Sequence, residues 1–274
     1  MKTLAIGDTH LMCGLILPLV DKNIKNIKID RIVFTGDYTD QWLQQENVDL
    51  FIRDLNFLYN WKTQKENEGI EVVCLLGNHD VPYILNWPLH YTLQGHENRL
   101  KVQELLLKLK PQISCFADDW LISHGGYLGQ HKFEEWHQTP FLNAPNSHDD
   151  VYTNLRQMDL DVGFCRGGYN YYGGPLWADI IEEFKIAPSE NYPYQCVSHR
   201  PLKCVSEFNY ENKIMIGIDT FSLIKLRDYP FYKQHVEEAG VVLLEGNDYM
   251  TINIPEWIEL KPEVICDYFE PEYL

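Results

Sequence analysis

Residues 31–37 read Arg31-Ile32-Val33-Phe34-Thr35-Gly36-Asp37, a short apolar run followed by a polar turn that begins with glycine. The same order of residue types occurs at 3–8 and at 72–78. Continuous apolar runs bounded by glycine are typical of strands buried on both faces of a sheet. Helix-like stretches at 14–25 and 47–62 separate the three runs. This alternation of strands and helices predicts a largely parallel sheet with right-handed crossovers.

Polar side chains follow each of the three runs. Asp8 and His10 follow the first, Asp37 follows the second, and Asn78 and His79 follow the third. In open parallel sheets, ligands bind beyond the carboxyl ends of the strands. The sequence therefore predicts that these five side chains gather at one edge of the sheet.

The rest of the chain predicts further strands around a long insertion. Residues 99–110 indicate a helix that Pro111 stops, and another helix is expected near 177–185. Residues 127–175 are rich in Gly, Asn, Tyr and Pro, and we interpret them as an irregular insertion that shapes the substrate cleft. No linker is visible, so residues 1–274 are expected to form one domain. The further strands, of which the later ones should form a more antiparallel set, are expected at 113–116, 120–123, 194–198, 213–218, 240–245 and 249–254.

Composition and charge limit the function. The chain has 274 residues, of which 45% are hydrophobic, and this is enough for a substantial core. A formal net charge of −17 repels a polyphosphate backbone, so we expect no tight sequence-independent binding of nucleic acid. Seven cysteines without a CxxC pair favour reduced thiols in a cytoplasmic protein. The apolar run 11–20 is too short to cross a bilayer and lacks the basic flank of a signal peptide, so no membrane partner is expected.

Five short signatures occur in chain order, each after an expected strand. They are Gly7-Asp8-Thr9-His10, Gly36-Asp37-Tyr38-Thr39-Asp40, Gly77-Asn78-His79-Asp80, Ser123-His124-Gly125-Gly126 and Ser198-His199-Arg200-Pro201. In these residues the chain resembles the calcineurin-like metallophosphoesterases, and most of all the serine/threonine protein phosphatases with their bacterial and phage relatives. The resemblance extends from residue 7 to about residue 220. It implies an α/β fold, a four-layer sandwich of two mixed β-sheets flanked by helices, with the site at one edge.

The resemblance also implies two metal ions. Such a site needs a carboxylate that bridges both ions, together with imidazole, carboxylate and amide ligands. Asp8 and His10 suit the first metal, and Asp37 suits the bridge. The ligands of the second metal would be Asn78, His124 and His199. This mixture favours transition metals over calcium, with manganese first and iron or zinc as alternatives. Many superfamily members end the last motif with His-x-His; Pro201 replaces the second histidine here, as in the protein-phosphatase branch, and leaves the first metal more open to water.

His79 has a different expected role. It directly follows a ligand, so its side chain should face the leaving group of the substrate. The resemblance implies that His79 is a general acid and that Asp40 orients its imidazole. Asp80 is assigned no chemistry, and the segment Ile218-Asp219-Thr220, which resembles bacterial relatives, is expected to be structural. The other histidines are expected at the surface or in structural positions: His90, His96, His131, His137, His148 and His235.

Substrate binding departs from the protein-phosphatase pattern. Those enzymes place a phosphate-clamping arginine after the second-motif aspartates, where this chain has Gln41. Gln41 can donate a hydrogen bond but carries no charge. Arg166 is the best replacement, because the glycines around it would let its guanidinium and the backbone approach an anion together. Arg200 is a weaker candidate.

Each of these positions also has a structural alternative. An aspartate before a helix, such as Asp8 or Asp37, is often an N-cap. His124 before two glycines could serve only a turn, and His199 and Arg166 could lie on the surface. The occurrence of all five signatures in order favours the functional interpretation.

These features favour hydrolysis of a phosphomonoester. The substrate would be a phosphoprotein, a nucleotide or another phosphorylated small molecule. The first alternative is a phosphodiesterase or dinucleoside-polyphosphate hydrolase that uses the same metals. The second is an inactive scaffold that binds partners through residues 127–175, and the complete ligand set argues against it.

Overall fold

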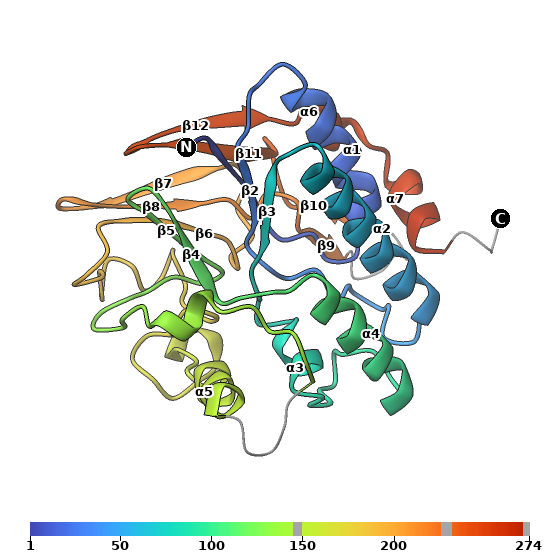
Figure 1. Ribbon diagram of the computed structural model, residues 1–274, viewed down its shortest axis with the longest axis horizontal. Helices are drawn as coiled ribbons and strands as arrows, with labels where there is room; N and C mark the ends of the chain where they lie inside the picture. Colours follow the sequence, from blue (N-terminus) through green and yellow to red (C-terminus); the bar gives the residue numbers. More distant parts are fainter. Residues whose placement is uncertain (145–149, 226–231, 271–274) are drawn as a thin grey trace.

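The computed structural model describes residues 1–144, 150–225 and 232–270. Within these ranges two five-stranded mixed sheets pack together, with helices alongside (Figure 1). This confirms the expected sandwich of two mixed sheets flanked by helices. The two-stranded sheet formed by β9 (Leu223–Lys225) and β10 (Tyr232–Gln234) was not expected.

The first sheet has the strand order β12-β11-β1-β2-β3. Strands β1, β2 and β3 run parallel, as predicted, while β11 pairs antiparallel with β1 and β12 pairs antiparallel with β11. The assignment of the last two strands to a separate antiparallel set is therefore wrong. Nearly every residue of β11 is buried, because it lies inside the sheet and covers the edge of β1. The strands are β1 (Thr3–Ile6), β2 (Arg31–Phe34), β3 (Glu71–Cys74), β11 (Gly240–Glu245) and β12 (Asp248–Asn253).

The second sheet has the strand order β4-β5-β6-β8-β7. Its inner strands β5, β6 and β8 are parallel, whereas the edge strands β4 and β7 are antiparallel to their neighbours. The expectation of a more antiparallel set is therefore wrong here too, because β6 and β8 pair parallel. Strand β7 was missed because its residues are only partly buried and give little apolar signal. The strands are β4 (Ser114–Ala117), β5 (Trp120–Ser123), β6 (Tyr194–Val197), β7 (Ser206–Tyr210) and β8 (Lys213–Gly217).

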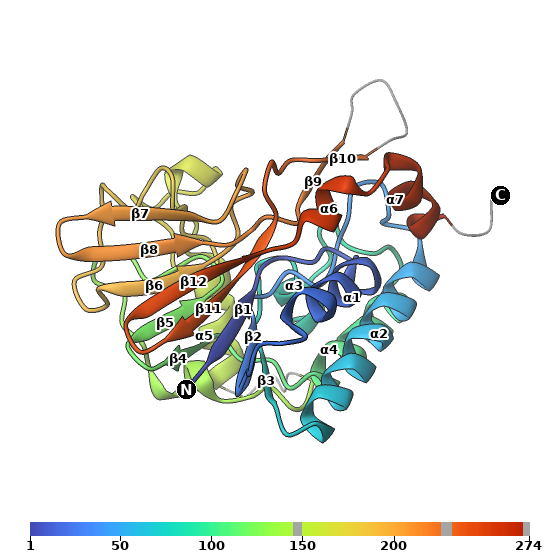
Figure 2. The same cartoon turned by 90° about the horizontal axis from the view of Figure 1, so that it is seen from above.

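Helices cover the outer face of the first sheet (Figure 2). Helix α2 packs between α1 and α4. It continues past the expected end at 62 to Asn67. Gly69, whose φ of +86° favours glycine, then ends the helix. The helices on this side are α1 (Cys13–Ile24), α2 (Val48–Asn67), α3 (Val81–Ile84), α4 (His96–Lys108), α6 (Pro255–Glu259) and α7 (Pro262–Phe269).

Successive side chains of the central strands point to opposite faces of the first sheet and pack into two different hydrophobic clusters. Leu4 and Ile6 of β1 pack with the helices, while Ala5 between them packs into the cluster between the two sheets. Ile32 and Val33 of β2 divide in the same way. Strands buried on both faces are what the continuous apolar runs predict.

The insertion is more regular than expected. It contains helix α5 (Asp150–Asp159), with 3-10 turns at η1 (Glu135–Gln138) and η2 (Phe164–Arg166). Residues 145–149, which include His148, lie outside the described part of the chain. The helix expected near 177–185 is not formed, and residues 180–186 are a run of turns. Glu183 satisfies nearby amides with its carboxylate and Phe184 is buried on the outer face of the second sheet, so the segment is stabilised without a regular helix.

Candidate metal centre and active site

The predicted ligands lie beyond the carboxyl ends of strands from both sheets. Parallel strands β1, β2 and β3 place Asp8, Asp37 and Asn78 after their last residues. Parallel strands β5 and β6 place His124 and His199 in the same way. The hydrogen-bonding distance between His124 and Asn78 shows that the two sets meet.

Asp8, His10 and Asp37 form the first potential ligand group. Nε2 of His10 lies 4.0 Å from Oδ2 of Asp8 and 3.8 Å from Oδ2 of Asp37. Nδ1 of His10 lies 3.1 Å from the carbonyl oxygen of Thr39 and 2.9 Å from that of Asp40. A carbonyl only accepts, so Nδ1 carries the proton. Burial lowers the pKa of His10, and the neutral ring directs the lone pair of Nε2 at the carboxylates.

Asp37, His124 and His199 form the second group. Nδ1 of His124 donates to the carbonyl oxygen of Thr35 at 3.0 Å, which leaves Nε2 unprotonated. This Nε2 lies 2.9 Å from Oδ1 of Asn78, 3.1 Å from Nδ1 of His199 and 3.4 Å from Oδ2 of Asp37. Burial lowers the pKa of both histidines well below the usual value, so both rings are neutral. Asp37 is the one residue that the two groups share.

The donor atoms of both groups fit metal ions. Burial raises the pKa of Asp8 to about 7, because its charged form loses hydration. Burial, together with the charge of Asp8, raises the pKa of Asp37 well above the usual value. Oδ1 of Asp8 is buried and has no hydrogen-bond partner among the described residues. A cation among these carboxylates and lone pairs would offset the lost hydration and the repulsion.

Asp80, to which the sequence assigned no chemistry, holds the turn that carries Asp37. Its carboxylate accepts from the backbone amides of Asp37, Tyr38, Thr39 and Gly77 at 2.7 to 3.2 Å, and also from the hydroxyl of Thr39. Asp37 has a φ of +53°, which is unfavourable for a residue with a side chain. The bonds to Asp80 offset that cost and fix the direction of the Asp37 carboxylate.

Two glycines permit the close approach of the second and third signatures. A Cβ atom on Gly77 would lie 2.0 Å from Oδ1 of Asp37. Gly36 has a φ of +105°, and a Cβ atom there would lie 2.2 Å from the amide nitrogen of Gly77. Glycine is therefore required at both positions for Asp37 and Asn78 to lie together.

His79 and Asp40 form the expected pair. Nδ1 of His79 lies 3.1 Å from Oδ2 of Asp40, and the Tyr83 hydroxyl donates to Oδ1 of Asp40 at 2.5 Å. The side chain of His79 is 29% exposed, whereas that of Asp40 is buried. Burial lowers the pKa of His79 to about 4 and raises that of Asp40 to about 8. Both groups are thus favoured in their neutral forms, and a proton shared between Nδ1 and the carboxyl satisfies both.

The three expected phosphate-binding residues are placed differently. Gln41 uses both of its polar atoms within the protein, since Nε2 donates to the carbonyl of His10 at 3.2 Å and Oε1 accepts from the amide of Trp42 at 2.9 Å. Arg166 lines the same cavity as His79 and His199. Nη1 of Arg200 lies 3.1 Å from Oδ2 of Asp179, and Arg200 is absent from the described residues that line the cavity.

The cavity at the strand ends has a volume of about 450 Å³. It combines residues of both ligand groups with His79 and Arg166. Sequence reasoning missed several of its lining residues, because they lie in loops outside the signatures or were interpreted as structural: Trp42, His90, Tyr91, Asp219 and Leu223. His90 was expected at the surface or in a structural position, and it is an exposed residue that lines this cavity.

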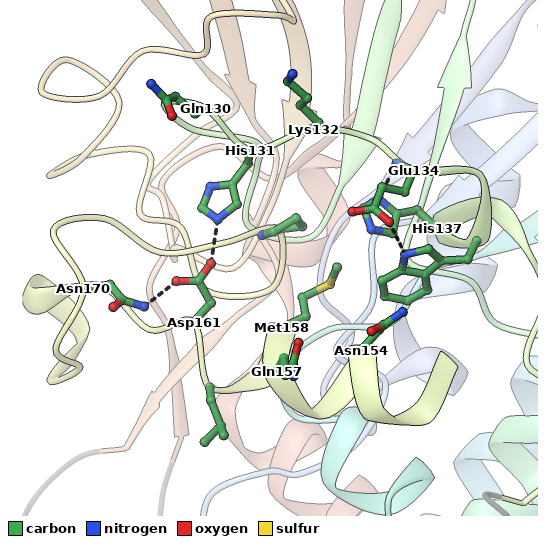
Figure 3. A pocket seen from close by; sticks show the side chains of 13 residues that line it. Gln130, His131, Lys132, Glu134, His137, Asn154, Gln157, Met158, Asp161 and Asn170 are labelled. Atoms are coloured by element: carbon green, nitrogen blue, oxygen red, sulfur yellow. Dashed lines mark hydrogen bonds and ion pairs between the residues drawn. The ribbon is translucent and has the colours of Figure 1, made fainter. Parts of the chain in front are cut away.

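A second cavity, of about 560 Å³, lies in the insertion (Figure 3). It shares no described lining residue with the first. His131 points toward Asp161, and Asp161 is bonded to Asn170. The segment 161–170 carries Arg166. The contact between Asp161 and Asn170 joins its two ends, and the contact with His131 attaches it to the rest of the insertion.

The sandwich and the polar groups at its edge define a metallophosphoesterase. A family model described as calcineurin-like phosphoesterase matches residues 1–216, so the chain belongs to that family. No curated protein matches the chain closely enough to count as a relative.

Solved structures show the same fold. The chain is similar to a cold-active protein-tyrosine phosphatase of a psychrophile, Shewanella SP., with 19% identity over 92% of this chain and 80% of that chain and a TM-score of 0.52. Another structure of a cold-active protein tyrosine phosphatase has 19% identity, the same coverage of 92% and 80%, and a TM-score of 0.55. A protein serine/threonine phosphatase from Saccharomyces cerevisiae has 15% identity over 92% of this chain and 79% of that chain, with a TM-score of 0.47. At such identities the first two similarities establish the fold alone.

Among the described residues, none of the helices has the length and apolar character that crossing a membrane requires.

Proposed function

We propose that the chain is a phosphomonoesterase that depends on two metal ions. The observation that carries this proposal is the pair of ligand groups that share Asp37 beside His79 and Arg166. Asp8, His10 and Asp37 would hold one ion. The second would be held by Asp37, Asn78, His124 and His199. Manganese is the first choice for this mixture of ligands, followed by iron or zinc.

Each residue then has a defined part in the reaction. When bound, the two ions supply Lewis-acid stabilisation of the phosphoryl oxygens and a nucleophile at neutral pH. His79 donates a proton to the departing oxygen, and its other nitrogen is held by Asp40. Arg166 binds phosphoryl oxygens, while Asp80 keeps the Asp37 carboxylate in place.

The charges in the cavity favour a monoester over a diester. A monoester presents a dianion, while a diester presents one negative charge and a second bulky group. Among the described residues that line the cavity, Arg166 is the one lysine or arginine. A guanidinium can bind two oxygens of one phosphoryl group. Arg166 therefore supplies the charge that Gln41 lacks.

The test compares hydrolysis of p-nitrophenyl phosphate with that of bis(p-nitrophenyl) phosphate by the manganese-loaded protein, beside metal analysis of protein purified without chelator. We expect close to two ions per chain and a clear preference in kcat/KM for the monoester. Faster hydrolysis of the diester would favour a phosphodiesterase or dinucleoside-polyphosphate hydrolase. Absence of both metal and hydrolysis would favour a scaffold.

We also propose that residues 1–274 work as one domain in the cytoplasm on phosphorylated small molecules, nucleotides or phosphoproteins. The site takes ligands from both sheets, which supports one folded unit. All seven cysteines are free thiols, which supports a reducing compartment. The net charge of −17 supports the expectation of no tight nucleic-acid binding.

A further inference from the structure

We infer that one side of the catalytic cavity is an aromatic site for the leaving group, and that the preferred substrates are aryl phosphomonoesters such as phosphotyrosine. This inference deepens the proposed function and rests on it. The residues that form the site are Trp42 and Tyr91, with Leu223 beside them; we call them the aromatic wall.

The position of the general acid identifies the leaving-group side. His79 must reach the departing oxygen, so the group bonded to that oxygen lies next to the His79 ring. The ring centroids of His79 and Tyr91 are 4.8 Å apart, and those of His90 and Tyr91 are 5.2 Å apart. A leaving group at His79 therefore meets Tyr91.

Trp42 is oriented toward the same region by its place in the chain and by a hydrogen bond. It follows Asp40 and Gln41, and it lines the cavity. Its Nε1 donates to the carbonyl oxygen of Leu223 at 3.1 Å, which restrains the indole. The residue is nevertheless 56% exposed. A large apolar ring that is restrained by a hydrogen bond and partly exposed at a catalytic cavity is suited to stacking on a flat group.

The charges of the described lining disfavour a polyphosphate in this site. The described lining has one guanidinium, Arg166, and the carboxylates Asp37, Asp40 and Asp219. With Arg166 and the metal ligands occupied by one phosphoryl group, no described lysine or arginine of the lining is left for a second. The leaving group is thus expected to be uncharged.

The size of the cavity favours a ring over an alkyl group. A volume of about 450 Å³ holds a phosphoryl group with a six-membered ring. The single methylene of a phosphoserine would leave Trp42 and Tyr91 uncovered. A phenyl ring bonded directly to the ester oxygen at His79 extends into the part of the cavity that Tyr91 and Trp42 line.

The test measures binding of phenylphosphonate and methylphosphonate, which are not hydrolysed, to the manganese-loaded protein by calorimetry. We expect phenylphosphonate to bind about 10-fold more tightly, the size of effect that an aromatic contact gives. Trp42→Ala and Tyr91→Leu should each reduce this ratio severalfold, whereas Trp42→Phe should keep most of it. Trp87→Ala is the matched control, because Trp87 is 38% exposed and does not line the cavity.

Equal binding of the two phosphonates by the wild-type protein would overturn the inference and leave the phosphomonoesterase proposal standing. An equal fall in the ratio for Trp87→Ala would also overturn it. If the metal-loaded protein bound neither compound, the proposed function itself would fail. As a second readout, kcat/KM should be higher for a phosphotyrosine peptide than for the phosphoserine peptide of the same sequence, and the reverse order would contradict the aromatic wall.

Discussion

At the scale of the residue, the neighbours of His79 separate its role from that of a ligand. Nδ1 is taken up by Asp40, and the side chain is partly exposed in the cavity. We expect His79→Asn to slow turnover by roughly 10²–10⁴-fold, the usual contribution of a positioned acid. The defect should shrink for esters with good leaving groups, which need little protonation. Metal content should stay unchanged, and a parallel loss of metal and rate would identify His79 as a ligand.

Arg166 and Arg200 form a natural pair for testing phosphate binding. Both approach Oδ2 of Asp179, at 3.8 Å and 3.1 Å, but only Arg166 lines the cavity. Arg166→Ala should lower kcat/KM for monoesters by roughly 10-fold or more, because a charge-assisted contact contributes about 1.5–3 kcal/mol. The loss for diesters should be smaller. Arg200→Ala is the control, and equal losses in the two variants would remove Arg166 from the site. Equal losses on the two ester types would remove the preference for monoesters that we assign to Arg166.

Residue types in the signatures were sufficient to predict which side chains gather, but not how their hydrogen bonds are used. Asp37 was expected beside Asp8 and Asn78 because all three follow buried strands, and His124 was added on the resemblance of its signature. The anchoring of Asp80 depends on a turn that brings four backbone amides to one carboxylate, and no local pattern encodes it. The side-chain amide of Gln41 was likewise expected to donate to the substrate, but it donates to the carbonyl oxygen of His10.

At the scale of the element, the turn after β2 depends on Asp80. Asp80→Asn replaces one accepting oxygen with an NH₂ group that faces backbone N–H groups. We expect a loss of stability of about 1–3 kcal/mol, because buried donors lose their partner. Metal affinity should also fall, since the turn carries Asp37. Urea unfolding and metal titration test this, with the exposed Asp119→Asn as control. Unchanged metal affinity would show that the turn holds its shape without Asp80.

The segment that carries Arg166 is held by a titratable contact. Nδ1 of His131 donates to the carbonyl of Leu128 at 3.0 Å, and Nε2 lies 2.6 Å from Oδ2 of Asp161. Burial lowers the pKa of His131, but the hydrogen bond and charge of Asp161 outweigh it and raise the pKa above the usual value. A raised histidine pKa stabilises the fold below the unfolded value, and this contribution is lost as pH rises through the folded value.

His131→Gln should therefore destabilise the protein more at about pH 5.5 than at about pH 9. Denaturant unfolding of both proteins at the two pH values measures the difference. Asp161→Asn should abolish the same pH dependence, since it removes the charge that favours the imidazolium. A destabilisation that did not change with pH would mean that the contact is an ordinary neutral hydrogen bond.

The strands could be predicted better than their arrangement. Short apolar runs located β1, β2 and β3 correctly, and the helices between them implied their parallel order. Strand β11 joined the first sheet against expectation, because pairing between segments more than two hundred residues apart leaves no local signal. The turns at 180–186 show helical spacing of apolar residues, but Glu183 and Asp179 bond nearby amides and compete with a helix.

At the scale of the whole molecule, the site joins the two sheets. Asp8 and Asp37 come from the first sheet, whereas His124 and His199 come from the second. Bound metal would therefore connect both halves of the sandwich. It would stabilise the folded state and not the unfolded state, because the unfolded chain has no assembled site. Ligand at 100 times its Kd adds about 2.7 kcal/mol. For a chain of this size the melting temperature should then rise by roughly 5–10 °C on metal loading.

Asp37→Asn separates two effects on the stability of the fold, which have opposite signs. One is the destabilisation by the buried carboxylate in the metal-free site, and the other is the stabilisation by bound metal. In the metal-free protein, burial and the charge of Asp8 disfavour the Asp37 carboxylate, so a neutral amide should leave the melting temperature unchanged or raise it. In the presence of manganese the wild type gains stability through two ions that share Asp37, and the variant should lose most of that gain together with its activity. Calorimetric melting of both proteins with manganese and with chelator measures all four states, and Asp119→Asn should follow the wild type in each. A variant that kept the full manganese-dependent rise would show that Asp37 does not bridge the ions, because the wild-type gain depends on the carboxylate common to both groups.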